Sequence, residues 1–245
     1  MLKDKNAVVT GGSRGIGRAI VERLCREGAS VVFSYAAAKD AAEEVIRTVE
    51  AAGGTAHAVR ADLAEPGAAE LLMEAAEEHL GALDILVNNA ALAFTPTPIA
   101  ETEEAAFERV MAVNTTAVFL TTRYAARQMR DGGRIVNIST LNTVRSAPGI
   151  APYAASKGAV EQLTAVAARE LGPRGITVNA VSPGATDTDL LRSTNPPERL
   201  EMVAGLTALG RLGQPADIAD VVALLAGPDA RWITGQTILA TGGLA

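Results

Sequence analysis

The sequence contains few of the residues that build disulfides, metal sites and aromatic clusters. Among 245 residues there are one cysteine, two histidines and 3% aromatic residues. Cys25 cannot form an internal disulfide, and its place in the apolar pattern of a helix indicates a buried thiol rather than a nucleophile. The histidines and acidic residues show no metal-ligand spacing. We therefore expect a reducing compartment and no metal site.

Long hydrophobic runs and an excess of positive charge are also missing. Apolar runs such as residues 221–226 are far shorter than the roughly 20 residues that span a bilayer. The N-terminus enters the apolar residues 7–9 at once, without the pattern of a secretory signal. A formal net charge of −6 offers no broad basic face for nucleic acid or anionic lipid. These features predict a cytoplasmic protein without nucleic-acid or membrane partners.

What the sequence does contain is the pattern of an α/β fold. Short β-branched runs alternate with segments of helical period, which predicts parallel strands joined by right-handed helical crossovers. Such a sheet, with helices on both faces, is the doubly wound or Rossmann architecture. We expect residues 1–245 to form a single domain of this kind. The seven predicted strands are 7–10, 30–34, 55–59, 85–87, 134–138, 177–181 and 237–239.

A glycine-rich segment follows the first predicted strand. Residues 10–17 read TGGSRGIG, so that Gly11, Gly15 and Gly17 stand where a chain must turn tightly and let a ligand approach its backbone. A helix starts directly afterwards, and its free N–H groups and partial positive charge suit a pyrophosphate. An ordinary tight turn is the alternative. The place of this segment in the first βαβ unit favours a dinucleotide site.

The end of the second predicted strand lacks a carboxylate. A site for NAD usually carries an acid about 20 residues after the glycines, where it binds the ribose 2′-hydroxyl. Here residues 33–37 read FSYAA, so no acid repels a 2′-phosphate, and Arg14, Ser34 and Lys39 can bind one. The sequence therefore favours NADP(H) over NAD(H). Simple exposure to solvent is the alternative for Arg14 and Lys39.

Tyr153 and Lys157 stand four residues apart at the start of a predicted helix, and so share one face of it. An ammonium close to a phenol favours the phenolate, which lowers the tyrosine pKa from about 10 toward the range of a useful general acid or base. By itself the pair is weak support for catalysis, because a tyrosine and a lysine at this spacing are usually surface residues.

Together with other motifs, from Lys5 to Gly243, these features resemble the short-chain dehydrogenase/reductase family. Three differences from the usual family pattern are alanine in place of a frequent glycine at Ala91 and Ala117, and threonine in place of a common aspartate at Thr241. The matching motifs, in the family's order and spacing, are TGxxxGxG at residues 10–17, Asp62-Leu63, Asn88-Asn89-Ala90, Asn114, Ser139-Thr140, Tyr153-x-x-x-Lys157, and Pro183-Gly184 with Thr188.

The resemblance implies a set of catalytic residues. Tyr153 would exchange a proton with the substrate oxygen, and Lys157 would hold the nicotinamide ribose and lower the Tyr153 pKa. Asn114 would fix a water that relays protons to Lys157. A hydroxyl from Ser139 or Thr140 would bind the substrate oxygen. Thr140 lies thirteen residues before Tyr153, the usual spacing of the family's serine, and strand alternation allows only one of the two neighbours to face that oxygen.

The resemblance also implies how the cofactor is bound. Asp62 would bind the adenine amino group, Asn88 and Ala90 would line the adenosine ribose, and Pro183, Gly184 and Thr188 would face the nicotinamide. The alternatives are a helix cap for Asp62, a turn for Asn88 and a plain loop for Pro183-Gly184. All of these residues, however, follow predicted strand ends, where an open parallel sheet binds its ligand. With the glycine segment, the expected cofactor-binding residues are Gly11, Ser13, Arg14, Gly15, Ile16, Gly17, Ser34, Tyr35, Asp62, Leu63, Asn88, Ala90, Tyr153, Lys157, Pro183, Gly184, Thr186 and Thr188.

The resemblance thus implies an NADP(H)-dependent oxidoreductase that interconverts a ketone and a secondary alcohol of a small molecule. Some similar proteins reduce 3-oxoacyl groups on acyl carrier protein, but Asp131 stands where a carrier-binding arginine would be useful, so other carbonyl substrates stay open. Substrate identity depends on residues 92–98, 141–152 and 187–209, whose fold the sequence does not predict.

The rival class is a catalytically silent NADP(H)-binding sensor or scaffold, against which the joint presence of Tyr153, Lys157 and Asn114 argues. The resemblance also implies a homotetramer, built on long helices around residues 103–129 and 153–171 and on the last strand.

Overall fold

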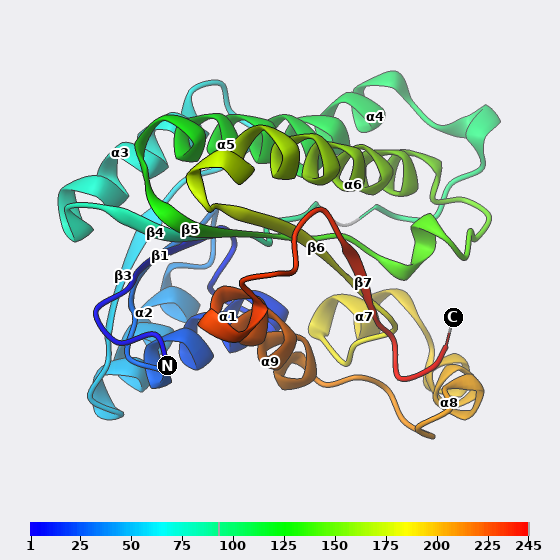
Figure 1. The fold of residues 1–245 in the computed structure, drawn as a ribbon. Coiled ribbons are helices and arrows are strands. Elements are labelled where there is room, and N and C mark those ends of the chain that lie inside the picture. Colours follow the sequence, from blue (N-terminus) through cyan, green and yellow to red (C-terminus); the bar gives the residue numbers. More distant parts are fainter. Residues whose placement is uncertain (93, 245) are drawn as a thin grey trace.

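The computed structural model describes residues 1–92 and 94–244, and at its centre lies a parallel seven-stranded sheet (Figure 1). Every predicted strand is found, and the predicted doubly wound α/β class is confirmed. The strand order is β3-β2-β1-β4-β5-β6-β7. The strands are β1 Asn6–Val9, β2 Ser30–Tyr35, β3 Thr55–Arg60, β4 Leu83–Asn88, β5 Met129–Ile138, β6 Thr177–Pro183 and β7 Thr237–Ala240.

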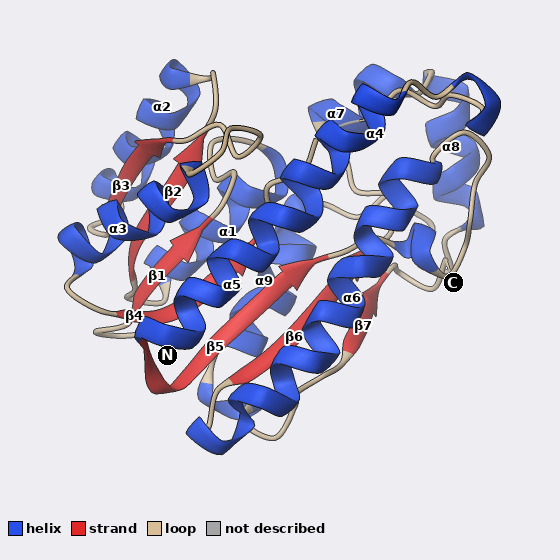
Figure 2. Ribbon diagram, turned by 90° about the horizontal axis from the view of Figure 1, so that it is seen from above, coloured by secondary structure: helices blue, strands red, loops and turns tan. Residues whose placement is uncertain are grey.

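Helices cover both faces of this sheet, as Figures 1 and 2 show. One face packs against α1, α2 and α9, and the other against α3, α5 and α6. Side chains alternate between the two cores along each strand, so that Val31 and Phe33 face α1 and α2 while Val32 faces α3. The helices are α1 Gly15–Arg26, α2 Lys39–Ala51, α3 Ala68–Leu80, α4 Glu104–Met111, α5 Ala117–Gln128, α6 Ala151–Leu171, α7 Asp189–Thr194, α8 Pro197–Leu206 and α9 Pro215–Ala226. In the described ranges, no helix combines the length and the hydropathy that a bilayer crossing requires.

The strand order reverses next to β1, and this reversal places the site. The chain runs outward from β1 through β2 to β3 and then returns to β4, which pairs with β1 on its other side. Crossovers therefore leave the carboxyl ends of β1 and β4 in opposite directions. A crevice opens at such a point, and ligands of doubly wound sheets bind there.

The long helix expected around residues 103–129 is interrupted. α4 ends at Met111, and a π-helical turn, Ala112–Thr116, separates it from α5. The hydrophobic pattern of residues 103–129 did not indicate this turn, which inserts one extra residue between two short helices. The turn contains Asn114, whose side chain is completely buried.

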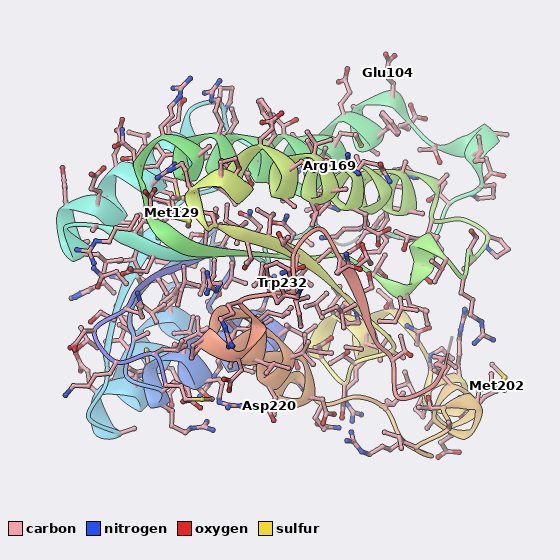
Figure 3. All side chains as sticks on the ribbon, in the orientation of Figure 1. Glu104, Met129, Arg169, Met202, Asp220 and Trp232 are labelled. Atoms are coloured by element: carbon pink, nitrogen blue, oxygen red, sulfur yellow. The ribbon has the colours of Figure 1, made fainter. Side chains whose placement is uncertain are left out.

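Two short helices that the sequence did not predict, α7 and α8, follow β6 and lie at the same end of the molecule as the C-terminus (Figure 1; Met202 marks α8 in Figure 3). The amide of Leu209, just after α8, donates to Gly242 O at 3.1 Å. Arg145 Nη1 donates to Leu244 O at 2.8 Å. Gly242 and Leu244 thus contact two of the three segments expected to determine substrate identity, residues 187–209 and 141–152. The third segment, residues 92–98, contains Ala93, which lies outside the described residues.

Candidate active site

The glycine segment between β1 and α1 forms a closely packed turn. Gly11 and Gly15 have φ values of +68° and +55°, which favour glycine. A Cβ on Gly11 would lie 2.9 Å from Ala90 Cα, and one on Gly17 would lie 2.1 Å from Gly11 O. No side chain caps the N-terminus of α1. The turn therefore leaves that helix terminus open, and the half-buried Ile16 packs its side chain against the core and can offer a ligand its backbone only.

Asn89 holds this turn in place, a role that the sequence analysis did not assign. Its Nδ2 donates to Thr10 O and Gly11 O, both at 3.0 Å, and its amide donates to Thr10 Oγ1 at 2.9 Å. The amide of Ala90 donates to the same hydroxyl at 2.9 Å. The end of β4 is thereby bound to the glycine segment across the crevice.

The neighbouring Asn88 is directed elsewhere. Its side chain is buried, its Nδ2 donates to Asn137 Oδ1 at 2.9 Å, and its Oδ1 accepts from the Thr121 hydroxyl at 2.7 Å. This side chain lies between the sheet and α5, so the expected contact of Asn88 with a ribose can involve only its main chain. Strand alternation was the available signal, because Leu86, two residues earlier, faces the same side.

Arg14 lies directly before α1, and Arg60 lies at the end of β3 beside the turn that follows β2. Arg14 and Arg60 are both exposed, and neither forms an ion pair within the part of the chain that the structure describes. Arg60 pairs in register with Tyr35, and its Nε donates to Ala36 O at 3.3 Å. Arg60 carries no signal of this position in the sequence, because only the pairing of β2 with β3 brings it to the turn.

The other predicted residues near this turn have structural contacts. Ser34 is buried, and its Oγ accepts from the Gly11 amide at 3.0 Å, so it supports the glycine segment from below. Asp62 is half-buried, and its Oδ1 accepts from the Ala64 amide at 3.0 Å. Tyr35 and Leu63 pack against the two cores on opposite faces of the sheet. Ser13 is buried within the glycine segment.

Tyr153 and Lys157 lie in the first two turns of α6, at the carboxyl end of β5. Lys157 is 2% exposed, and its Nζ donates to Ile138 O at 2.7 Å. Burial lowers the pKa of Lys157 to about 8. Burial also raises the pKa of Tyr153, and the hydrogen bond with the Thr140 side chain opposes that rise. The contribution that opposes burial comes from Thr140, and the expected lowering of the Tyr153 pKa by Lys157 stays a prediction.

Asn114 anchors the start of the same helix. Its Oδ1 accepts from the Leu92 amide at 2.8 Å, and its Nδ2 donates to Ser156 Oγ at 3.1 Å. The Ser156 hydroxyl donates in turn to Tyr153 O at 2.7 Å. The structure thus brings Asn114 into the site through Ser156, next to Lys157 in the chain, with its side-chain amide already engaged.

Ser139 and Thr140 face opposite sides of the chain where β5 ends. The Ser139 hydroxyl donates to Glu161 Oε1 at 2.6 Å. The Thr140 Oγ1 accepts from the Asn142 amide at 3.3 Å, and the same side chain lies close enough to Tyr153 to lower the pKa of its phenol. This is the divergence expected from strand alternation, and it brings Thr140 rather than Ser139 to the phenol.

The end of β6 closes the crevice opposite α1. Pro183 is the last residue of β6, and a Cβ on Gly184 would lie 3.0 Å from Thr241 Cα. Thr186 Oγ1 donates to Gly184 O at 3.1 Å. Thr188 caps α7, and its Cγ2 lies 3.4 Å from the position of a Cβ on Gly15. Chain segments after β1 and β6 therefore meet over the carboxyl edge of the sheet.

These features fit a dinucleotide. The α1 terminus has no side-chain cap, exposed guanidinium groups lie beyond it, and the buried Lys157 ammonium has one hydrogen-bond acceptor among the described residues although it carries three donors. Gly11, Gly15 and Ser13 would border the pyrophosphate, Asp62 and Ala90 the adenosine, and Lys157 and Thr188 the nicotinamide end.

Comparison with known proteins gives matches over nearly the whole chain. Residues 11–245 match the family described as enoyl-(acyl carrier protein) reductase. An uncharacterized oxidoreductase of Methylorubrum extorquens is 45% identical over 99% of this chain and 98% of its own length. A versicolorin reductase of Emericella nidulans is 40% identical over 99% of this chain and 96% of its own.

Solved structures agree with these matches. A short-chain dehydrogenase/reductase from Serratia marcescens has a TM-score of 0.94 at 46% identity and covers 99% of this chain and 98% of its own. A blue fluorescent protein from a metagenomic library, in complex with NADPH, has a TM-score of 0.93 at 42% identity, covering 100% and 99%. An angucycline C-6 ketoreductase with bound NADP has a TM-score of 0.93 at 45% identity, covering 99% and 96%.

Proposed function

The chain belongs to the short-chain dehydrogenase/reductase family of oxidoreductases, and from this membership we propose that it interconverts a ketone and a secondary alcohol with NADP(H) as its cofactor. The observation that carries the proposal is the half-buried Tyr153, which has the Thr140 side chain beside it and the buried Lys157 one helical turn away. A phenol, a hydroxyl and an ammonium converge there at the carboxyl edge of a doubly wound sheet. The small-molecule carbonyl or alcohol substrate would bind beside them.

In the direction of reduction, Tyr153 donates its proton to the carbonyl oxygen. Because burial raises the Tyr153 pKa, the phenol holds this proton at neutral pH. Thr140 donates a second hydrogen bond to the same oxygen and orients it. A bound nicotinamide supplies hydride to the carbonyl carbon, or accepts it from the alcohol carbon in reverse. The phenolate regains its proton from solvent, by a path that ends at Tyr153 and passes Lys157.

The turn after β2 supports a preference for NADP(H). Residues 36 and 37 are alanines, so no carboxylate stands where it would repel a 2′-phosphate. Arg14 precedes α1, and Arg60 bonds to the turn through Ala36 O. Two solved relatives hold NADPH and NADP, respectively. A guanidinium group forms strong paired hydrogen bonds with phosphate oxygens.

The experiment is Tyr153→Phe, which keeps the ring and its packing and deletes the transferred proton. Turnover of NADPH with a panel of ketones should fall by ~10²-fold or more. NADPH affinity, measured by nicotinamide fluorescence, should stay within ~2-fold of wild type, which separates chemistry from binding. If the variant keeps most of its kcat on every ketone that the wild type reduces, another group supplies the proton and the proposal fails.

A further inference from the structure

Three consecutive residues, the last two of β5 and Ser139 directly after it, are each hydrogen-bonded to α6. Asn137 Nδ2 donates to Thr164 Oγ1 at 2.8 Å, Ile138 O accepts from Lys157 Nζ at 2.7 Å, and Ser139 Oγ donates to Glu161 Oε1 at 2.6 Å. These contacts come from successive turns of α6. The helix that carries Tyr153 is therefore fixed along β5 by polar contacts as well as by apolar packing.

Glu161 makes the widest of these connections, through a single oxygen. Its Oε1 accepts from Ser139 Oγ at 2.6 Å, from Thr143 Oγ1 at 2.8 Å and from Ser182 Oγ at 3.1 Å. Ser139 and Ser182 are buried, at 3% and 0% exposure. The donors belong to the end of β5, to the short 3₁₀ turn Leu141–Thr143 and to the end of β6. One carboxylate oxygen thus joins three segments that border the proposed active site.

Thr140 lies between two of these donors in the chain. Ser139 and Thr143 are both drawn toward α6, and the Thr143 hydroxyl also lies 3.0 Å from Thr140 O. Because neighbouring side chains of an extended chain point in opposite directions, a Ser139 hydroxyl held by Glu161 leaves Thr140 on the other side. On that side the Thr140 side chain lies near Tyr153 and lowers the pKa of its phenol.

We propose that Glu161 is a positioning residue for the reaction: by holding the Ser139 hydroxyl on the α6 side, it fixes the end of β5 so that the Thr140 hydroxyl faces Tyr153 and the substrate oxygen. The inference rests on the proposed function, in which Thr140 and Tyr153 address that oxygen. Glu161 itself touches neither substrate nor cofactor in this arrangement. Its effect reaches the reaction through Thr140.

The geometry also indicates which property of Glu161 is needed. All three hydroxyl donors end on Oε1, and Oε2 accepts no hydrogen bond from the described residues. A glutamine with its carbonyl oxygen in the place of Oε1 can keep all three contacts. Glu161→Gln should therefore keep kcat within ~3-fold of wild type, whereas Glu161→Leu, which removes the acceptor, should lower kcat by ~10-fold or more.

Thr164→Val is the matched control. It removes the neighbouring contact between β5 and α6 while keeping the shape of the side chain, and it leaves Asn137 Nδ2 without that acceptor. Both variants should lower the melting temperature, but only Glu161→Leu should lower kcat, and neither should change the NADPH dissociation constant by more than ~2-fold. Equal losses of kcat in Thr164→Val and Glu161→Leu would reduce Glu161 to a structural residue and overturn the proposal.

A double-mutant cycle tests whether Glu161 acts through Thr140. In a Thr140→Val background the Glu161→Leu change should cost less than ~3-fold further in kcat/KM, because the contact it protects is already gone. A full additional loss would show that Glu161 acts independently. Should Glu161→Leu fail to fold, Ser139→Ala, which keeps two of the three donors to Glu161, replaces it in the same cycle. If the loss of kcat/KM caused by Ser139→Ala is the same in the Thr140→Val background, the proposal is overturned.

The two levels of inference fail differently. If Tyr153→Phe and Thr140→Val leave turnover unchanged, the proposed function itself is wrong. If both abolish turnover while Glu161→Leu retains it, only the positioning role of Glu161 is wrong.

Discussion

At the scale of single residues, burial sets the protonation states on which the site depends. Tyr153 is half-buried and Lys157 is buried, and this partial or full loss of water pushes each toward its neutral form. For the phenol this preserves the proton that a reduction needs. For Lys157, burial raises the free energy of the charged ammonium form. A ligand whose hydroxyl groups accept hydrogen bonds from Nζ would stabilise that form, so the free site should favour such a ligand.

The choice between the two neighbouring hydroxyls can be tested directly. Thr140→Val keeps the shape of the side chain and removes its hydrogen bond, so kcat/KM should fall by ~10²-fold, as for the loss of one preorganised donor. Ser139→Ala should cost less than ~10-fold, because Ser139 bonds to Glu161 and not to the phenol. Steady-state kinetics with one ketone decide the matter. The reverse order of the two losses would assign the role to Ser139.

The low Lys157 pKa has a consequence for stability. Burial lowers it from 10.5 to about 8 in the folded protein. Between these pH values the unfolded chain binds a proton that the folded chain does not, so the free energy of unfolding should rise with pH across this window. Below about pH 8, where Lys157 is charged in both states, its burial should destabilise the folded protein by the full amount. The comparison is cofactor-free wild type against Lys157→Met, in urea titrations from pH 7 to 10.5.

Other groups cancel in that comparison. Cys25 and Tyr124, whose pKa values burial raises to about 12, are present in both proteins and contribute equally to the two curves. Wild type should therefore gain stability relative to Lys157→Met as pH rises. Parallel curves would mean that Lys157 keeps its proton in the folded protein, and that burial does not govern its charge.

At the scale of elements, the sequence predicted what periodicity and chain direction determine. All seven strands were found in place, and the helix expected at residues 153–171 corresponds to α6, Ala151–Leu171. The opposite directions that strand alternation predicts for Ser139 and Thr140 agree with the bond from Ser139 to Glu161, and the role of Thr140 stays a prediction. The π turn at Ala112–Thr116, by contrast, leaves no periodic signal. α7 and α8 were missed because short helices over a crevice depend on contacts with distant segments, such as Leu209 with Gly242.

Strand pairing explains the remaining misses at the site. Arg60 reaches the turn after β2 only because it lies beside Tyr35 in the sheet, and that register is not a local property of the chain. The sequence did not distinguish Asn89 from Asn88, because either side-chain amide could hold a turn. Only the packed structure shows that Asn89 is the one that bonds to the glycine segment. Residue type was therefore predictable, whereas the partner of each side chain required the fold.

The turn between β2 and α2 yields the cofactor prediction. NADPH should bind at least ~10-fold tighter than NADH, about 1.4 kcal/mol, because arginines and not an acid border the ribose position. Arg14→Ala and Arg60→Ala should each weaken NADPH binding and leave NADH binding unchanged. Arg47→Ala is the control, since Arg47 lies exposed on α2 and pairs with Glu44. Fluorescence titrations at one salt concentration measure all of these, and equal affinities for the two cofactors in wild type would refute the argument.

At the scale of the whole molecule, the seven strands form one sheet with two helical layers, and we propose that residues 1–245 act as a single domain. Its surface has exposed apolar side chains in several places, two of which lie on opposite sides of the sheet. Trp232, Leu224 and Leu239 are 96%, 50% and 42% exposed near the edge strand β7 (Trp232 is marked in Figure 3). Phe119 on α5 and Val166 on α6 are 47% and 53% exposed on the opposite layer.

Two separate apolar faces suit two different two-fold contacts, because a self-complementary patch pairs with its own copy. Pairing across both faces gives a homotetramer with two-fold symmetry, and covering the open edge of β7 removes a site of uncontrolled strand pairing.

Light scattering at micromolar concentration should give about four times the 25.2 kDa of the chain. A charge placed in either face, Trp232→Glu or Val166→Glu, should leave dimers held by the other face. Met202→Glu, on α8 and 58% exposed, is the control and should remain tetrameric. A wild-type mass equal to one chain would remove the tetramer, and monomers from either single variant would show that the two contacts form only together.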